Sequence, residues 1–238
     1  MNAEKLSKRL ERVAGYIPNG AILADIGSDH AYLPCYVIKE NMAVKAIAGE
    51  VVDGPYLSAL NQVKSLHMEA LIDVRKGDGL EVLKTGEVTA ISICGMGGAL
   101  ITSILENGKD KLSGDERLIL QPNIGANSIR NWLLIEGWEL INEEIIEEDG
   151  KIYEILVAEK GEALKPYRKY ASKEAAVLMG PFLIEERSDI FLKKWDMELK
   201  NWRRILKQLD ESKKNIRTEE KRKEIQTSIR LVEEVVNG

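Results

Sequence analysis

Short apolar runs alternate with helical stretches along the first two thirds of the chain. The run Ala21-Ile22-Leu23-Ala24-Asp25-Ile26 is almost continuously apolar, which is typical of a strand buried on both faces of a sheet. Strands that alternate with helices in this way predict βαβ units, and therefore a parallel sheet with helices on both faces. The predicted strands are residues 21–26, 43–49, 71–74, 89–94 and 117–120, and the predicted helices are residues 4–17, 31–40, 55–68, 98–107 and 126–136.

Two further strand-like runs, residues 138–147 and 152–159, break this alternation. Only Glu148-Asp149-Gly150-Lys151 separates them, and Asp-Gly between two such runs is a strong signal for a β-hairpin. A connection this short cannot join parallel strands, so the pair must be antiparallel. The sequence therefore predicts an α/β fold with a seven-stranded, mostly parallel sheet that ends in an antiparallel hairpin. This arrangement is typical of Rossmann-like class I methyltransferases, whereas an ordinary dinucleotide-binding domain keeps its sheet parallel.

After Gly161 the strand signal ends and the pattern becomes helical. Residues 168–187 look helical, with an interruption at Gly180-Pro181. Apolar residues then repeat at alternating spacings of three and four, as in the seam of a coiled coil, and a second apolar stripe follows. We expect an antiparallel, coiled-coil-like helical hairpin, connected around residues 211–218, with its two tryptophans in the core. The two stripes are Leu192, Trp195, Leu199, Trp202, Leu206 and Leu209, and then Ile225, Ile229, Val232 and Val236.

The formal net charge of −5 is unevenly distributed over two predicted domains, residues 1–164 and residues 165–238. The first domain carries 16 Lys and Arg against 26 Asp and Glu, whereas the second carries 18 against 13. An acidic body with a basic C-terminal part suggests that the second domain binds a polyanion. A charged, solvated helix surface would have the same composition, and charge alone leaves both interpretations open.

The remaining composition excludes several classes of protein. Hydrophobic residues make up 44% of the 238 positions, which is enough for a sizeable core. Two cysteines and two histidines at scattered spacings are too few for a disulfide framework or a structural zinc site, so we expect no metal. The chain starts without an apolar leader, and no apolar run approaches the roughly 18 residues of a membrane span. We therefore expect a soluble, cytoplasmic protein without membrane association or an obligate protein partner.

Acidic residues stand at the ends of the first three predicted strands, where the ligands of open α/β sheets bind. The first strand leads into Asp25-Ile26-Gly27-Ser28-Asp29-His30, which lacks the G-x-G-x-x-G phosphate fingerprint and suits a cation such as S-adenosylmethionine. A helix N-cap is the alternative role for Asp29. Glu50 ends the second strand, at the spacing of a carboxylate that binds ribose hydroxyls. Asp78-Gly79 follows the third strand and would approach an adenine edge or form a plain turn.

Glycines crowd the end of the fourth predicted strand, in Cys94-Gly95-Met96-Gly97-Gly98. Such a cluster at a sheet edge indicates close backbone approach to another group, which opposite a cofactor would be the acceptor base. Tight packing of helix against strand is the alternative for Gly97 and Gly98, and Cys94 is expected to point into the core. The fifth strand ends in Gln121-Pro122-Asn123, which would supply amide groups at the same edge.

Three segments make the chain similar to a known family: residues 25–34, Gly95-Met96-Gly97-Gly98 and Leu120-Gln121-Pro122-Asn123. They resemble the bacterial tRNA (adenine-N1)-methyltransferases that modify adenine 22. The similarity extends over essentially the whole chain, including the C-terminal helical hairpin. The resemblance implies a class I methyltransferase fold, S-adenosylmethionine as the cofactor and tRNA as the substrate.

The resemblance also implies a role for each candidate residue. Asp29 is the candidate catalytic residue, because methylation at N1 puts positive charge on the adenine ring and a nearby carboxylate stabilises that charge or accepts the N6 proton. The cofactor group comprises Asp25, Gly27 and His30 at the methionine side, Glu50 at the ribose, Asp78 and Gly79 at the adenine, and Gly95 beside the transferred methyl group. The base pocket comprises Met96, Gly97, Gly98, Gln121, Pro122 and Asn123.

Within this interpretation the helical hairpin has a purpose. Its cations lie largely off the apolar seam, where they would bind tRNA phosphates with a steep dependence on salt. These cations are Lys193, Lys194, Lys200, Arg203, Arg204, Lys207, Lys213 and Lys214.

Other functions remain to be weighed against tRNA methylation. A class I methyltransferase acting on a small molecule or a protein is the nearest alternative, and the basic hairpin argues against it. A non-catalytic RNA-binding or assembly protein would use the hairpin as a docking coiled coil, and production of S-adenosylhomocysteine would exclude it. An NAD-dependent dehydrogenase is disfavoured by the missing G-x-G-x-x-G and by the terminal antiparallel hairpin.

Overall fold

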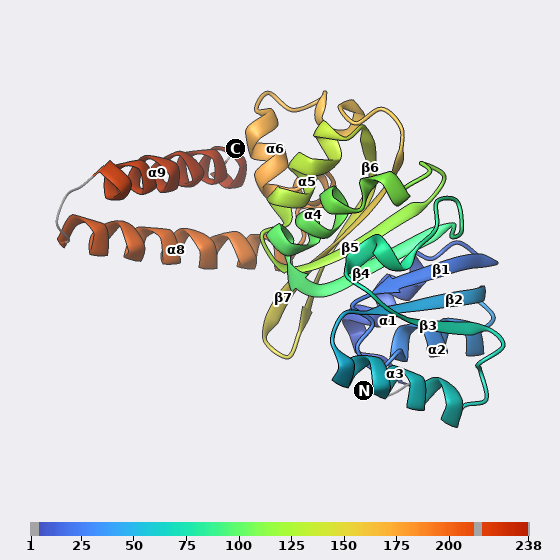
Figure 1. The fold of residues 1–238 in the computed structure, drawn as a ribbon. Coiled ribbons are helices and arrows are strands. Elements are labelled where there is room, and N and C mark those ends of the chain that lie inside the picture. The colour runs from blue at the N-terminus through green and yellow to red at the C-terminus, as the bar shows by residue number, and fades with distance from the viewer. Residues whose placement is uncertain (1–4, 212–215, 238) are drawn as a thin grey trace. The chain divides into compact units, whose positions relative to one another are not determined.

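The computed structural model describes residues 5–211 and 216–237, and within them seven strands form one sheet in the order β3-β2-β1-β4-β5-β7-β6 (Figure 1). The first five strands pair in parallel, whereas β7 is antiparallel to both β5 and β6. The predicted α/β fold with a terminal antiparallel hairpin is therefore confirmed. The strands are β1 Ala21–Ile26, β2 Ala43–Glu50, β3 Ile72–Lys76, β4 Ala90–Gly97, β5 Arg117–Ile124, β6 Trp138–Glu148 and β7 Lys151–Lys160.

Helices cover both faces of the sheet, with α1, α2 and α3 on one face and α4 and α5 on the other (Figure 1). Buried residues of the first three helices share one core with the strands, and Val13, Val37 and Val63 belong to the same buried cluster as Leu23. This two-layer burial explains why the parallel strands read as continuous apolar runs. The helices are α1 Lys8–Gly15, α2 Tyr32–Lys39, α3 Asp53–Ser65, α4 Gly98–Asn107 and α5 Ala126–Ile135.

Two strands at the centre of the sheet run further than the apolar pattern indicates. The pattern ends at residues 94 and 120, whereas β4 continues to Gly97 and β5 to Ile124. Their register shifts between Cys94 and Met96, and again between Met96 and Gly97. Glycine and proline in these extensions weaken the apolar signal, because both residues are poor strand formers. The irregular ladder brings the glycines of β4 next to the last residues of β5.

The hairpin between β6 and β7 turns as the Asp-Gly pair predicts. Asp149 and Gly150 both have positive φ, +50° and +73°, which is the conformation of a type I′ turn. Glu148 and Lys151 are the last paired residues before the turn. The turn therefore fixes the antiparallel register of the two longest strands of the sheet.

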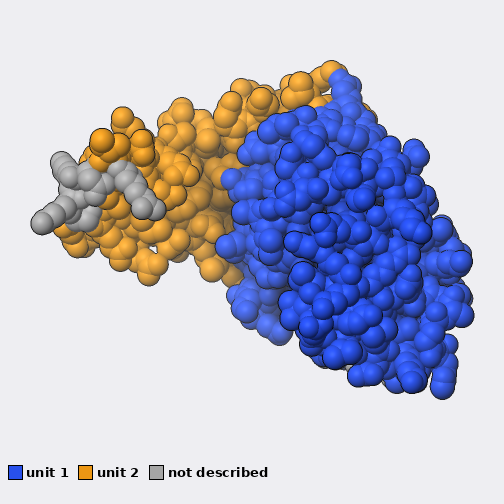
Figure 2. Space-filling view, in the orientation of Figure 1, with its two compact units in different colours: residues 1–163 blue, residues 164–238 orange. Residues whose placement is uncertain are grey.

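The chain divides into two compact units, residues 1–163 and residues 164–238, coloured separately in Figure 2. All regular secondary structure in the described part of the second unit is helical, and a φ of +95° at Gly180 ends one helix before Pro181 begins the next. Its long helices α8 and α9 run antiparallel to each other (Figure 1). The unit comprises a 3₁₀ turn at Lys165–Tyr167, α6 Lys173–Met179, α7 Pro181–Glu186, α8 Asp189–Glu211 and α9 Ile216–Asn237.

The seam between α8 and α9 contains the predicted apolar residues. Trp195 and Leu199 are buried on α8, and Ile225 and Val232 are buried on α9. The ring of Trp195 lies 6.2 Å from that of Trp202, centre to centre. Trp195 is therefore part of the apolar interior of the hairpin, as the seam spacing predicts, whereas Trp202 is half-buried beside it.

Candidate active site

A pocket of about 320 Å³ opens at the carboxyl ends of β1 and β4. Parallel strands end together at this edge, which is where open α/β sheets bind their ligands. The first unit contributes helix α1, the stretch that runs from the end of β1 through the following turn into α2, and the end of β4. The lining residues are Arg9, Leu10, Asp25, Gly27, Ser28, Asp29, Tyr32, Leu33, Cys94, Gly95 and Met96.

Asp25 provides a carboxylate in a fixed position at the base of this pocket. It is 4% exposed and accepts hydrogen bonds from the Oγ atoms of Ser28 and Ser92, each at 2.6 Å. Burial raises the pKa of the Asp25 carboxyl, while the two serine hydroxyls oppose that rise. Two hydrogen bonds from different segments hold the carboxylate still, so it is suited to bind a cationic group.

Asp29 and Glu50 are joined through the backbone. Asp29 has a positive φ of +56°, and its backbone N–H donates to the buried Glu50 carboxylate. Burial raises the pKa of the Glu50 carboxyl, and the Asp29 N–H opposes the rise. Left-handed backbone at a non-glycine residue is strained and is concentrated at functional sites. The N-cap of α2 is Ala31, so the structure excludes the alternative that Asp29 caps this helix.

His30 lies beside Asp29 at the mouth of the turn. Its Nε2 atom is 3.6 Å from Asp29 Oδ1, and its ring stacks on Tyr32 with 5.1 Å between ring centres. His30 does not itself line the pocket, whereas Tyr32 does. The imidazole therefore supports the pocket wall from outside in this structure.

Asp78 and Gly79 lie at the adjacent strand end but outside the pocket. The N–H of Gly77, just before them, donates to the backbone oxygen of Glu50 at 2.9 Å, so the tips of β2 and β3 are neighbours. Asp78 is exposed, and Gly79 has a φ of +53° where a 3₁₀ turn, Gly79–Val82, begins. The structure thus brings Asp25, Asp29 and Glu50 together and places Asp78 further along the same edge.

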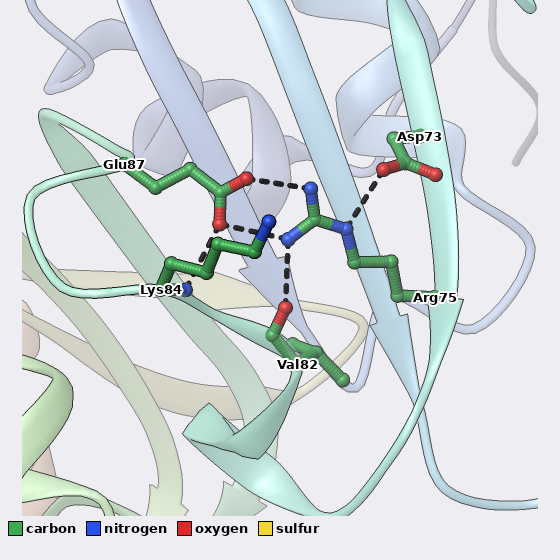
Figure 3. Close-up of polar contacts among 5 residues, drawn as sticks. All are labelled: Asp73, Arg75, Val82, Lys84 and Glu87. Carbon is green, nitrogen blue, oxygen red and sulfur yellow. Dashed lines mark hydrogen bonds and ion pairs between the residues drawn. The ribbon is translucent and has the colours of Figure 1, made fainter.

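The segment after Asp78 is clamped by Arg75 of β3, as Figure 3 shows. The guanidinium donates to the Val82 backbone oxygen at 2.8 Å and to both carboxylate oxygens of Glu87, at 2.8 and 2.6 Å. It also donates to Asp73 at 2.8 Å. The bonds from Arg75 to Glu87 lower the pKa of that carboxyl to about 2, and the bond to Val82 helps to fix the loop that carries Asp78.

Gln121 and Asn123 hold the Gly95 turn rather than present free amides to a base. Gln121 is fully buried; its Oε1 accepts from the Gly95 N–H at 3.1 Å and from Arg9, and its Nε2 donates to the Pro122 backbone oxygen at 2.8 Å. The exposed Asn123 donates to the Gly95 oxygen at 2.6 Å. The sequence predicted direct base contacts for Gln121 and buried Pro122, but neither lines the pocket. Burial and internal hydrogen bonding explain the difference for Gln121, because the side chain has no exposed surface and its oxygen already accepts two bonds.

The glycines of β4 serve different purposes. A Cβ on Gly98 would lie 2.0 Å from the Gly125 backbone oxygen, so Gly98 is required for tight packing between two backbones. Gly97 has no such close contact. A Cβ on Gly27 would lie 2.2 Å from Met96 Cε, so the Met96 side chain lies directly over the first turn. Tight packing, which was the alternative to a base contact, therefore explains Gly98, whereas Gly95 and Met96 border the pocket.

Cys94 is partly buried and packs against the hydrophobic core, as expected, and it also lines the pocket. Burial of the thiol raises its pKa, so the group is a protonated thiol at neutral pH. The sequence also missed Arg9, Leu10, Tyr32 and Leu33 as pocket residues. Arg9 lies off the apolar stripe of its helix, and nothing in the pattern indicates that the polar face meets a pocket.

The predicted phosphate-binding cations of α8 are mostly exposed and largely engaged with neighbours. Lys200 pairs with Asp196 at 2.6 Å, Arg203 pairs with Glu233 at 2.6 Å, and Arg204 donates to Asn201 at 2.9 Å. Lys194 lies over the Trp195 ring at 4.9 Å. Lys193 and Lys207 are exposed on the same helix, whereas Lys213 and Lys214 lie outside the described residues.

The site fits S-adenosylmethionine better than a metal or a dinucleotide. Two carboxylates, Asp25 and Asp29, stand in one pocket with glycine turns that permit close approach, and they complement the ammonium and sulfonium charges of that cofactor. Among residues 5–211 and 216–237, no group of three or more His, Cys, Asp or Glu side chains is arranged to hold a metal ion. None of the helices in the same residues is long and apolar enough to cross a membrane.

A mostly parallel seven-stranded sheet with a terminal antiparallel hairpin, and an acidic pocket at its carboxyl edge, defines a class I S-adenosylmethionine-dependent methyltransferase. The family model described as tRNA (adenine(22)-N(1))-methyltransferase, TrmK, matches residues 23–234. The chain therefore belongs to the tRNA (adenine(22)-N(1))-methyltransferase family.

Individual relatives agree with this assignment. The tRNA (adenine(22)-N(1))-methyltransferase of Bacillus subtilis is 54% identical over 237 residues, which cover 100% of this chain and 99% of the relative. A crystal structure of the B. subtilis enzyme has a TM-score of 0.94, with 98% of this chain and 99% of that chain covered. The Streptococcus pneumoniae protein Sp1610 in complex with S-adenosyl-L-methionine is 42% identical, with a TM-score of 0.84 and coverage of 98% and 100%.

Proposed function

We propose that this chain transfers the methyl group of S-adenosylmethionine to N1 of adenine 22 in tRNA. The observation that carries the proposal is the pocket in which the Asp25 and Asp29 carboxylates meet the Gly95-Met96 turn, within a chain of this family. Because tRNA is the substrate, we also propose that the enzyme works in the cytoplasm. The expected independence from a protein partner stays a prediction.

The cofactor supplies a methyl group already activated on a sulfonium, so the chain's residues contribute position and charge more than nucleophilic power. Asp25, held by Ser28 and Ser92, is suited to bind the ammonium group of the methionine moiety. Glu50 is suited to accept from ribose hydroxyls, and Asp78 lies further along the edge for the adenine.

The rigid Gly95 turn borders the position of the acceptor. Both backbone groups of Gly95 are occupied, its N–H by Gln121 and its oxygen by Asn123, so the turn keeps its shape when a base approaches. Adenine N1 is normally hidden in base pairing, so the base must leave its stack to reach the pocket. Pre-set geometry at this turn favours in-line attack by the N1 lone pair.

We assign Asp29 as the catalytic residue of the chain. Its carboxylate lines the pocket and remains 64% exposed in the side chain, so it is accessible to a bound base. Positive charge develops on adenine during N1 methylation, and a nearby carboxylate stabilises that charge or takes the N6 proton.

The second unit, residues 164–238, is proposed to bind tRNA through its helical hairpin. Exposed cations on α8 provide positive charge along one helix, in contrast to the acidic first unit. Binding through exposed cations is mainly electrostatic and independent of base sequence.

The activity is tested by incubating unmodified tRNA with the protein and S-adenosylmethionine, followed by nucleoside mass spectrometry. We expect N1-methyladenosine, with reverse-transcription arrest that maps it to adenine 22. A methyl group found elsewhere in tRNA, or only on small molecules or proteins, would contradict the proposal. Binding of tRNA without any S-adenosylhomocysteine would instead support the non-catalytic alternative.

The role of Asp29 is tested with Asp29→Asn, because asparagine tolerates the left-handed backbone that alanine would strain. We expect kcat to fall by roughly 10²- to 10⁴-fold with the cofactor Kd nearly unchanged. The Kd is measured by calorimetric titration. A large loss of cofactor affinity would show instead that Asp29 binds the cofactor.

A further inference from the structure

The side chain of Ile124 is exposed at the last position of β5, at the sheet edge where the acceptor base is expected. Its exposed fraction is 77%, although isoleucine is a large apolar residue. Exposure alone does not define a site, because single apolar residues are common on protein surfaces, and Ile135 at the end of α5 is 78% exposed. Two features distinguish Ile124 from Ile135: the backbone that carries it and the glycine that it faces.

A bulge in β5 sets the direction of the Ile124 side chain. Met96 and Gly97 are consecutive on β4, but their partners on β5 are residues 122 and 124. Asn123 is therefore an extra residue on β5, and its side chain donates to a backbone oxygen of β4 at 2.6 Å. Bulges re-aim side chains and are common next to active sites. The strand end that carries Ile124 is thus fixed by a specific irregularity.

Ile124 lies over a glycine, which leaves its apolar surface uncovered on the side of β4. A Cβ on Gly97 would lie 4.0 Å from Ile124 Cγ1, and apart from the chain neighbours of Gly97 no other atom of the described residues is within 4 Å of that position. Gly97 directly follows Met96, which lines the cofactor pocket. The Gly97 backbone and the Ile124 side chain therefore present an apolar surface just outside that pocket.

We propose that Ile124 is a positioning residue that packs against the ring of the extruded adenine 22 and directs its N1 atom to the methyl group of the cofactor. This inference rests on the proposed function for the identity of the acceptor. A base that leaves its stack loses contacts on both faces, and enzymes that act on extruded bases hold them between aromatic or apolar side chains. Among the described residues that line the pocket only Tyr32 is aromatic, and its ring already stacks on His30.

An exposed apolar side chain can also enter the gap that an extruded base leaves in a nucleic-acid stack. The position of Ile124 favours contact with the adenine itself. Its side chain lies over Gly97, one residue from the pocket lining, so it is next to the place where the acceptor atom meets the methyl group. Gap filling is therefore the competing outcome of the test.

The first measurement is kcat/KM for methylation of unmodified tRNA. Ile124→Ala is expected to lower it by about 10-fold or more, because most of the apolar contact with the ring is lost. Ile124→Leu, which conserves the side-chain volume, is expected to stay within about threefold of the unmodified protein. Ile135→Ala is the matched control, with equal exposure at the opposite end of α5, and is expected to stay within about twofold. The cofactor Kd is expected to be unchanged in all three variants, since neither isoleucine lines the pocket.

The second measurement separates the adenine from the gap that it leaves. The Kd of tRNA is determined in the presence of S-adenosylhomocysteine, for tRNA with adenine 22 and for tRNA that lacks only this base. Ile124→Ala is expected to weaken binding of the complete tRNA by about 5- to 10-fold. Binding of the abasic tRNA is expected to be the same for the variant and the unmodified protein, because the lost contact requires the base.

An equal loss of affinity for both tRNAs would assign Ile124 to the gap and overturn the inference. So would an unchanged kcat/KM in Ile124→Ala, or an equal loss in Ile135→Ala. A raised cofactor Kd in Ile124→Ala would show a structural role instead and overturn it as well. If the unmodified protein did not methylate adenine 22, the proposed function itself would fail, so the two failures are distinguishable.

Discussion

The two units of this protein use charge in opposite ways. In the first unit, which has a net charge of −10, the charges that matter are buried and held by fixed partners, as Asp25 is held by two serines. In the second unit, with a net charge of +5, they lie exposed on long helices, as Lys200 does beside Asp196. A buried charge has one position and strong interactions, whereas an exposed charge is mobile and screened by salt. The first arrangement suits chemistry at one atom, and the second suits attraction to a polyanion.

The largest effect is expected when a buried charge is removed from the first unit. Arg130 of α5 is fully buried and joins Glu143 of β6 at 2.6 Å to Glu154 of β7 at 2.5 Å. Arg130→Met is expected to lower the free energy of unfolding by about 3 to 5 kcal/mol, because two carboxylates are left buried without a counter-ion. Urea unfolding followed by tryptophan fluorescence measures the loss.

Two further variants serve as controls for Arg130. Arg203→Met removes the exposed pair with Glu233 in the second unit and is expected to cost less than about 1 kcal/mol. Adding Glu143→Gln and Glu154→Gln to Arg130→Met is expected to recover much of the lost stability, since the unpaired charges disappear. Equal losses for Arg130→Met and Arg203→Met would contradict the distinction between the two units.

A second prediction concerns Asp25, where burial serves binding at the expense of stability. Burial raises the pKa of this carboxyl, so above its unfolded pKa the charged form costs folding free energy. Asp25→Asn is expected to weaken cofactor binding by about 10- to 100-fold without loss of stability. Calorimetry and urea unfolding measure the two effects, and a matching loss of stability would show that Asp25 is structural. In the unmodified protein, cofactor affinity is expected to fall as the pH drops through the raised pKa.

The clamp at Arg75 gives an intermediate, partly buried case. Its bonds lower the pKa of Glu87 from 4.5 to about 2, so this carboxylate stabilises the fold above pH 4.5, and the contribution disappears as pH falls from 4.5 to 2. Glu87→Gln is expected to cost about 1 to 2 kcal/mol at neutral pH and to flatten the acid unfolding curve in that window. Glu234→Gln, which removes an exposed helix pair with Arg230, is the control and should leave the curve unchanged. Parallel curves for both variants would refute the clamp.

The smallest effects are expected on the exposed face of α8. Replacing Lys200, Arg204 and Lys207 singly by Gln should weaken tRNA binding only modestly. Each lost phosphate contact is expected to reduce the slope of log affinity against log salt by about 0.7 to 0.9. Binding assays over a range of salt concentrations provide the slope, with the cofactor Kd as an internal check. An unchanged slope in the triple variant would contradict the docking role of the second unit.

Local patterns were sufficient for most of the fold. The spacing of apolar residues, with the Gly, Pro and Asp-Gly residues that bound each apolar run, predicted every strand of the sheet, because these signals are local. The pattern failed at the ends of β4 and β5, where Gly97 and Pro122 pair irregularly despite their poor strand propensity. Tertiary pairing with a neighbouring strand overrides propensity at such positions.

For the site, the acidic residues at the strand ends and the glycine cluster could be predicted from the sequence, but the residues that hydrogen-bond to them could not. Asp25, Asp29 and Glu50 do meet at one edge, because strands in a parallel sheet end together. Gln121 was expected to contact the adenine base, yet it is buried and accepts a hydrogen bond from the Gly95 turn. Such roles depend on which neighbour satisfies a side chain's hydrogen bonds, and that neighbour is distant in sequence.

By itself, the order of residues determined the alternation of strand and helix, the hairpin at Asp149-Gly150 and the charge contrast between the two units. These properties depend on residue types and on neighbours a few positions apart, so they can be predicted from the sequence. It is the tertiary packing that brings Arg9, from a helix before the first strand, to the pocket and that places Arg130 between two buried glutamates. Both depend on helices docking against strands more than a dozen residues away, where packing and the need to pair buried charge select the contact.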